Sequence, residues 1–127
     1  MNRFQFLVHE VFSAQYVDFL TAHQDYHSSL ITQLRKSHQD PANAGSPLRR
    51  ISSPQLAGRL YKLWVRQEGF RYVYLFLPCK AIVLPIWISR DLRAKLDWDG
   101  EPWEEITGEI MADLNPFKKE RFLDWTP

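Results

Sequence analysis

The chain has 127 residues, a mass of 15.1 kDa and a formal net charge of +1. A chain of this length is expected to form one domain, and 45% hydrophobic with 14% aromatic residues exclude a largely disordered or collagen-like chain. The single cysteine, Cys79, excludes an intramolecular disulfide and a multi-cysteine zinc site. We therefore expect a cytoplasmic protein, with neither a signal peptide nor a membrane-spanning helix.

The charge is divided unevenly along the chain. Residues 1–95 hold 13 Lys and Arg against 6 Asp and Glu, a net charge of +7, whereas residues 96–127 hold 3 against 9, a net charge of −6. A basic body is typical of proteins that bind nucleic acid. It is equally typical of a solvated surface whose charges pair with an acidic tail.

The first 40 residues predict one strand and two helices. Large apolar residues alternate over residues 3–12, which is a strand pattern. Ser13 is the expected N-cap of a helix that ends near His23. Asp25 is the expected N-cap of a second helix that ends near His38, so the two helices should form an antiparallel hairpin.

A loop and three strands are expected next. Prolines, serines and a glycine interrupt both periodicities over residues 40–54. Branched and aromatic residues then predict strands at 60–65, 70–77 and 81–88. Pro85 has no amide hydrogen, so we expect it at a bulge or on an open edge of the sheet.

The C-terminal part is predicted to be partly helical. Residues 90–98 suggest a short helix, and Pro102 suggests the start of a longer one, with acidic residues near its positive end. Asn115, followed by proline, should end that helix. The predicted organisation is a domain at residues 1–95 and an acidic, partly helical extension at 96–127, packed on or near it.

The resulting order of elements is β-α-α-β-β-β-α. This order predicts an α+β fold in which two N-terminal helices pack on a small, mostly antiparallel sheet, with a helical C-terminal extension. The sequence contains no P-loop, no G-x-G-x-x-G and no G-x-S-x-G motif. We expect neither a metal nor a small-molecule cofactor.

Three cations on or beside the predicted strands form the most informative group. Lys62 alternates with Trp64 on one strand, Arg71 lies on the next, and Arg90 follows the last. Adjacent antiparallel strands bring such side chains close together on a shared face. Clustered cations favour a bound anion, for which a phosphate backbone is the natural candidate. The alternative is that each cation reaches water or pairs with an acid of the tail.

The residues from Leu48 to Arg90 resemble the RelE/ParE superfamily of toxin–antitoxin toxins. The resemblance is carried by Leu48-Arg49, by a tyrosine–lysine strand at Tyr61-Lys62, by Gly69-Phe70-Arg71-x-x-Tyr74 and by a strand that closes on Arg90. It implies a cognate antitoxin protein as partner and, for RelE-like members, cleavage of mRNA, in some cases on the ribosome. That reaction uses no metal and proceeds by attack of the RNA 2′-hydroxyl on the adjacent phosphate.

The resemblance also implies roles for individual residues. Lys62 matches a lysine that binds phosphate or acts as a base, and Arg71 matches an arginine that stabilises the transition state. Arg90 matches the arginine after the last strand, with Arg93 as the alternative. The surrounding residues expected to bind RNA are Arg49, Arg50, Arg59, Trp64, Arg66 and Arg93.

Two departures from the RelE pattern keep other functions open. Trp64 stands where RelE has a second lysine, and the last tyrosine of the chain is Tyr74, so the C-terminal tyrosine of that family has no counterpart. An endoribonuclease is the leading interpretation. The alternatives are a ParE-like toxin that acts on DNA gyrase without a nuclease site, and a non-catalytic member that binds nucleic acid or protein.

Overall fold

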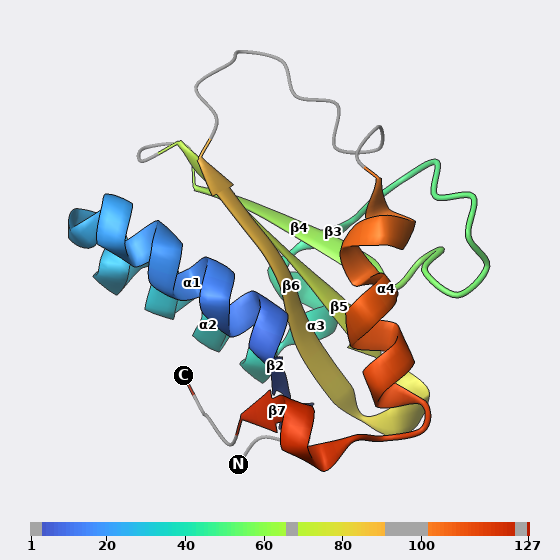
Figure 1. The fold of residues 1–127 in the computed structure, drawn as a ribbon. Coiled ribbons are helices and arrows are strands. Elements are labelled where there is room, and N and C mark those ends of the chain that lie inside the picture. Colours follow the sequence, from blue (N-terminus) through green and yellow to red (C-terminus); the bar gives the residue numbers. More distant parts are fainter. Residues whose placement is uncertain (1–3, 66–68, 91–101, 124–126) are drawn as a thin grey trace.

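The computed structural model describes residues 4–65, 69–90, 102–123 and 127. Helices α1 (Glu10–Ala22) and α2 (His27–Gln39) cover one face of a five-stranded sheet, and α4 (Trp103–Leu114) covers the other (Figure 1). The strands lie in the order β1 (Gln5–Phe6), β6 (Ile82–Arg90), β5 (Phe70–Leu77), β4 (Leu60–Val65) and β3 (Ser46–Pro47). Strand β1 runs parallel to β6, and the other neighbouring pairs of this sheet are antiparallel. The predicted α+β fold is confirmed.

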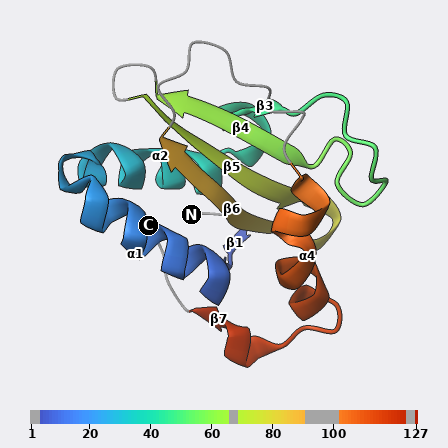
Figure 2. The same cartoon turned by 45° about the horizontal axis from the view of Figure 1, so that its top comes forward.

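The two N-terminal helices form the predicted hairpin. A 3-10 turn, η1 (Gln24–Tyr26), joins α1 to α2, and Figure 2 shows the helices meeting at that turn. Both predicted N-caps are wrong. Helix α1 begins at Glu10, and the backbone N–H of Val11 donates to Nδ1 of His9 at 3.1 Å. Asp25 lies inside η1 rather than before α2.

The segment expected as an irregular loop contains two short elements. Helix α3 (Pro41–Ala44) is followed by β3, in which Ser46 pairs with Lys62 of β4. The hydroxyl of Tyr74 holds this segment on the sheet, because it donates to the carbonyl of Pro41 at 2.6 Å and accepts from the N–H of Gly45 at 3.0 Å. Burial raises the pKa of Tyr74, so the hydroxyl keeps the proton that it donates.

An apolar core lies on each face of the sheet. The core beside α1 and α2 contains Phe6, Val8, Phe12, Phe19, Leu30, Leu34, Phe70, Tyr72, Tyr74, Phe76, Val83 and Ile88. The core beside α4 contains Leu7, Leu48, Leu56, Leu60, Val73, Leu75, Leu77, Leu84, Ile86, Trp103, Ile110 and Leu114. Alternate residues of β5 point to opposite faces, and all eight are buried.

Strand β6 follows the 3-10 turn η2 (Pro78–Lys80) and extends two residues beyond the predicted end. Its register against β5 shifts between Val73 and Tyr74, and Pro85 pairs with Tyr74 beside this irregularity. The prediction of a bulge near Pro85 is therefore confirmed. On the α1 side, the backbone N–H of Ile88 donates to Oε1 of Gln15 at 2.6 Å, which satisfies a group that no strand covers there.

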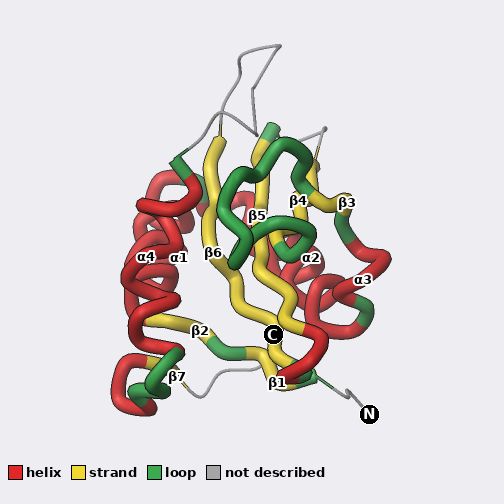
Figure 3. Tube along the Cα trace, turned by 90° about the vertical axis from the view of Figure 1, so that its right-hand side faces the viewer, coloured by secondary structure: helices red, strands yellow, loops and turns green. Residues whose placement is uncertain are grey.

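The C-terminal helix begins and ends where the sequence predicts. After it come a 3-10 turn, η4 (Lys119–Arg121), and β7 (Phe122–Leu123), which pairs antiparallel with β2 (Val8–His9). Figure 3 shows β2 and β7 together near the end of α4. The helix expected at residues 90–98 lies outside the described residues, except for its first position.

A buried histidine joins this C-terminal segment to the start of α1. His9 is fully buried, and its Nε2 lies 2.7 Å from Oδ2 of Asp113. Because Nδ1 accepts from Val11, the proton of the neutral ring is on Nε2, which donates to the carboxylate. One histidine therefore caps α1 and binds α4.

Arg121 extends this arrangement into a cluster of charges. Its Nε donates to Asp113 at 2.9 Å, its Nη2 to Glu109 at 2.8 Å, and its Nη1 lies 3.1 Å from Glu10. These contacts join α1, α4 and η4. We call the group of His9, Asp113 and Arg121 the histidine cluster.

Replacement of Gly45 by alanine should destabilise the fold. A Cβ atom at this position would lie 2.7 Å from the backbone carbonyl oxygen of Lys62, so β3 would have to move away from β4. We expect the free energy of unfolding, measured with urea, to fall by about 1–3 kcal/mol. Gly108→Ala is the control, because a Cβ there meets nothing within 4 Å, and it should raise stability by about 0.5–1 kcal/mol. Equal effects of the two changes would contradict the steric argument.

The histidine cluster should make stability depend on pH. The hydrogen bond from His9, and then the hydrogen bond and the charge of Arg121, hold the pKa of Asp113 below its ordinary value, although burial opposes them. A lowered carboxyl pKa contributes stability above the ordinary value, near pH 4, and that contribution is lost as the pH falls through the folded-state pKa.

This pH dependence can be measured by urea unfolding between pH 6 and pH 3. We expect the stability of the wild type to fall more steeply over this range than that of Asp113→Asn. Glu105→Gln removes an exposed carboxylate from the same helix and should keep the wild-type slope. Parallel curves for the wild type and Asp113→Asn would rule out this role of Asp113.

Candidate nucleic-acid interface

The hairpin of β4 and β5 brings three of the predicted site residues to one face of the sheet. Trp64 pairs directly with Arg71, and Lys62 pairs with Val73. Because alternate residues of a strand share a face, Lys62, Trp64 and Arg71 lie on the same side as Val73, which belongs to the α4 core. We call these three residues the basic face.

The three side chains differ greatly in exposure. Trp64 is 47% exposed, Lys62 is half-buried, and Arg71 is only 2% exposed. The guanidinium carbon of Arg71 lies 5.8 Å from the centroid of the Trp64 ring, within the range of a cation–π interaction. A phosphate that approaches this surface therefore meets Lys62 and Trp64 before it can reach Arg71.

The last strand brings a serine, and not Arg90, opposite Arg71. In the register of β5 and β6, Arg71 pairs with Ser89 and Arg90 pairs with Phe70. The side chain of Arg90 lies outside the described part of the structure, as do Arg66 and Arg93. The backbone therefore brings Lys62, Trp64 and Arg71 together and leaves the role of Arg90 as a prediction.

Three more of the predicted arginines, Arg49, Arg50 and Arg59, are exposed and lie near the start of β4, at the opposite end of that strand from Trp64. Arg49 and Arg50 follow β3, and Arg50 adopts a positive φ of 59°. Arg59 directly precedes β4 and donates from Nη1 to the carbonyl of Gln55 at 3.2 Å. Arg59 also lines a groove of about 540 Å³ beside α4, together with Lys80.

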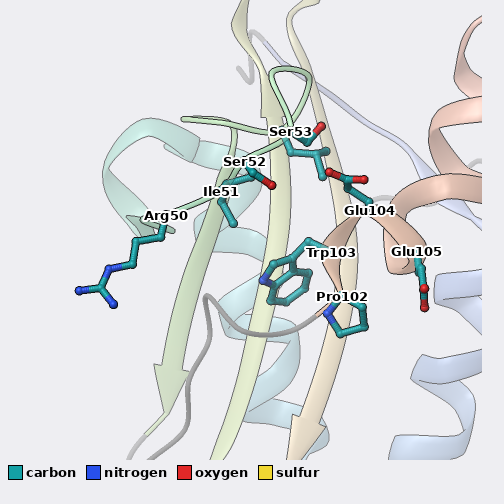
Figure 4. A pocket seen from close by; sticks show the side chains of 9 residues that line it. Arg50, Ile51, Ser52, Ser53, Pro102, Trp103, Glu104 and Glu105 are labelled. Carbon is teal, nitrogen blue, oxygen red and sulfur yellow. The ribbon is translucent and has the colours of Figure 1, made fainter.

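A pocket of about 290 Å³ lies between the loop after β3 and the first turn of α4, and residues of both segments line it. Figure 4 shows Ile51 and the indole of Trp103 within it, while the guanidinium of Arg50 extends away from Trp103. Glu104 and Glu105 also line this pocket. Two carboxylates oppose the binding of a phosphate, so the basic face suits an RNA backbone better than this pocket does.

Two tryptophans outside the predicted set of RNA-binding residues, Trp87 and Trp103, lie beside the basic face. Trp87 pairs with Val73, which in turn pairs with Lys62, so the three form a row across the sheet. Trp103 meets Trp87 edge to face, with ring centroids 5.6 Å apart. The start of α4 thus packs directly beside the row that carries Lys62.

Trp87 was missed because its side of the sheet depends on the bulge. Continuing the register of Tyr74 and Pro85 without a shift would pair Trp87 with Tyr72, on the side of α1 and α2. The shift pairs Trp87 with Val73 instead. The proline offers a sequence signal for an irregularity, but it does not specify where the extra residue lies.

Known proteins offer limited similarity to this chain. No family model matches the sequence, and no curated protein matches it. Among solved structures, the crystal structure of the isolated E. coli RelE toxin is similar, with 23% sequence identity and a TM-score of 0.37 over 71% of this chain and 79% of that chain.

Neither a metal-binding cluster nor a membrane-spanning helix occurs among the described residues. Within residues 4–65, 69–90 and 102–123, no three His, Cys, Asp or Glu side chains gather in a way that could hold a metal ion. None of the described helices has the length and apolar character needed to cross a membrane.

Two tryptophans of this region should differ sharply in their importance for stability. Trp103 is 3% exposed and packs in the α4 core, so we expect Trp103→Ala to lower the free energy of unfolding by about 3–5 kcal/mol. Trp64→Ala removes a side chain that is 47% exposed and should cost far less. Urea unfolding of both variants tests this. A large loss in Trp64→Ala would make Trp64 a structural residue.

Proposed function

We propose that the chain is the toxin component of a toxin–antitoxin system and that it acts on RNA through the basic face. The observation that carries this proposal is the pairing of β4 with β5, which puts Lys62, Trp64 and Arg71 on one side of the sheet. Single-stranded RNA is bound by cations that meet its phosphates and by aromatic rings that meet its bases. The motif resemblance described above supports the same assignment.

The proposed reaction is cleavage of mRNA without a metal. The 2′-hydroxyl oxygen attacks the adjacent phosphorus and the bond to the 5′ oxygen breaks, which leaves a cyclic phosphate and a 5′-hydroxyl. A base takes the proton of the 2′-hydroxyl, and an acid supplies one to the leaving oxygen. In this proposal Lys62 stabilises the negative charge that builds up on the phosphate oxygens.

Three further parts of the proposal come from the resemblance. Arg71 and Arg90 complete the catalytic group, Arg49, Arg50, Arg59, Arg66 and Arg93 contribute to RNA binding, and a cognate antitoxin restrains the toxin. The ribosome is the proposed site at which the mRNA is presented. None of these steps requires a small-molecule cofactor.

A second candidate function is favoured by one observation, the burial of Arg71. An arginine that is 2% exposed cannot touch a transition state unless the groups packed around it move away. RNA binding without cleavage needs no such movement, because Trp64 and Lys62 already reach the surface. The second candidate is therefore a non-catalytic RNA-binding member of the same fold.

Induction in a bacterial host, with RNA 5′ ends mapped within minutes, distinguishes these functions. We expect the wild type to arrest growth and to generate new 5′-hydroxyl ends. Lys62→Met should lose both effects because it removes the charge and keeps the aliphatic stem. Lys36→Met, at an exposed position on α2, is the matched control and should behave as the wild type does.

Other outcomes of the induction experiment would contradict the nuclease. Arrest without new 5′ ends would point to another target, such as DNA gyrase. Normal growth and intact RNA, with a soluble and folded protein, would favour the non-catalytic candidate.

A further inference from the structure

The exposed indole of Trp64 is an unusual feature of an otherwise well-packed sheet. Among the described residues, the large hydrophobic side chains that remain exposed are Val11, Val17, Trp64, Phe117 and Leu123. Trp64 is the aromatic residue of this group that lies on the five-stranded sheet. Its position inside β4 fixes its backbone through the pairing with β5, so the ring is presented from a rigid element.

Arg71 supports this ring from beneath. The two residues are directly opposed on neighbouring strands, and the guanidinium carbon lies 5.8 Å from the ring centroid. Arg71 is almost fully buried, whereas nearly half of the indole is exposed. The cation therefore faces the indole from the buried side, and nearly half of the indole remains exposed at the surface.

Lys62 lies at a suitable distance for a second contact with the same ligand. It is two residues from Trp64 on the same face, which corresponds to about 7 Å along a strand. An aromatic platform with a cation one step along it matches a nucleotide, whose flat base and charged phosphate are a few bonds apart. Stacking of this kind requires a base that is not already stacked inside a duplex.

We propose that Trp64 is a stacking platform for an unpaired base of single-stranded RNA and that Arg71 acts as its positioning residue. This assignment rests on the RNA-binding part of the proposed function and describes the RNA-bound state, before any rearrangement around Arg71 that a cleavage step would require. It separates two contributions to affinity. Trp64 supplies a contact that depends little on salt, and Lys62 supplies one that depends strongly on salt.

The test is binding of a labelled eight-nucleotide RNA, measured by fluorescence anisotropy over a range of salt concentrations. The RNA carries 2′-O-methyl groups, which remove the nucleophile and so prevent cleavage during the measurement. We expect Trp64→Ala to weaken binding by about 5- to 150-fold with an unchanged salt dependence. Lys62→Met should instead reduce the slope of log K against log salt by about 0.7.

Two controls show whether the effect belongs to the ring of Trp64. Phe117→Ala removes another exposed aromatic ring, which is 50% exposed and lies after α4, and it should leave RNA binding unchanged. Trp64→Phe should retain part of the affinity because it keeps an aromatic face. A duplex of the same sequence should bind Trp64→Ala and the wild type equally.

A double-mutant cycle tests the role of Arg71. Arg71→Lys keeps the charge and loses the planar group that faces the indole. It should weaken RNA binding in the wild type and have no further effect in Trp64→Ala, with folding of each variant checked by circular dichroism. Additive losses would show that Arg71 does not act through Trp64 and would overturn its positioning role.

Failure of this inference and failure of the proposed function give different results. If Lys62→Met weakens binding and Trp64→Ala does not, the stacking platform is wrong and the RNA function stands. If the folded wild type binds no RNA, both the proposed function and the stacking role of Trp64 are wrong. An equal loss of single-stranded and duplex binding in Trp64→Ala would overturn the assignment to an unpaired base.

Discussion

The burial of β5 on both faces is the constraint on which the rest of the structure depends. All eight of its residues are buried, and their alternation sends Tyr72 and Tyr74 toward α1 and α2 and sends Val73 and Leu75 toward α4. A strand that is apolar on both sides needs a packed layer on each of them. Helix α4 is therefore as necessary to the core as the N-terminal hairpin is. The histidine cluster then attaches the end of α4 to the start of α1.

The burial of β5 also explains why the residues of the basic face differ in exposure. Arg71 occupies a position in a buried strand, where a charge is costly unless other groups stabilise it. The ring of Trp64, directly opposite on β4, supplies one such contact and remains exposed itself. The face thus has an indole outside, a guanidinium beneath it and a lysine beside it. Binding can use the outer groups as they stand, whereas a catalytic role for Arg71 requires the groups packed around it to move.

The parts of the fold that could be predicted from the sequence are those decided by local pattern. Strands β4 and β5 begin and end as predicted, because each is a run of branched and aromatic residues bounded by turns. Helix α3 and strand β3 were not predicted, because they depend on Tyr74, about 30 residues away. The sequence could also predict that Lys62 and Arg71 share a face, because alternate residues of a strand point to the same side and the turn between β4 and β5 sets their register. The burial of Arg71 could not be predicted in this way, because it depends on what packs above the sheet.

The acidity of the C-terminal segment suggested that its carboxylates pair with the cations of the basic body. In the structure, the described carboxylates of α4 either face solvent or bind Arg121, which belongs to the C-terminal segment itself. Glu104 and Glu105 are exposed, and Glu109 and Asp113 bind Arg121. The apolar side of the helix meanwhile places Trp103, Ile110 and Leu114 in the core. A helix that completes a core cannot leave without exposing that core to water. The described surface that the basic face offers to a ligand is therefore the exposed ring of Trp64 and the partly exposed Lys62, and not the side that α4 covers.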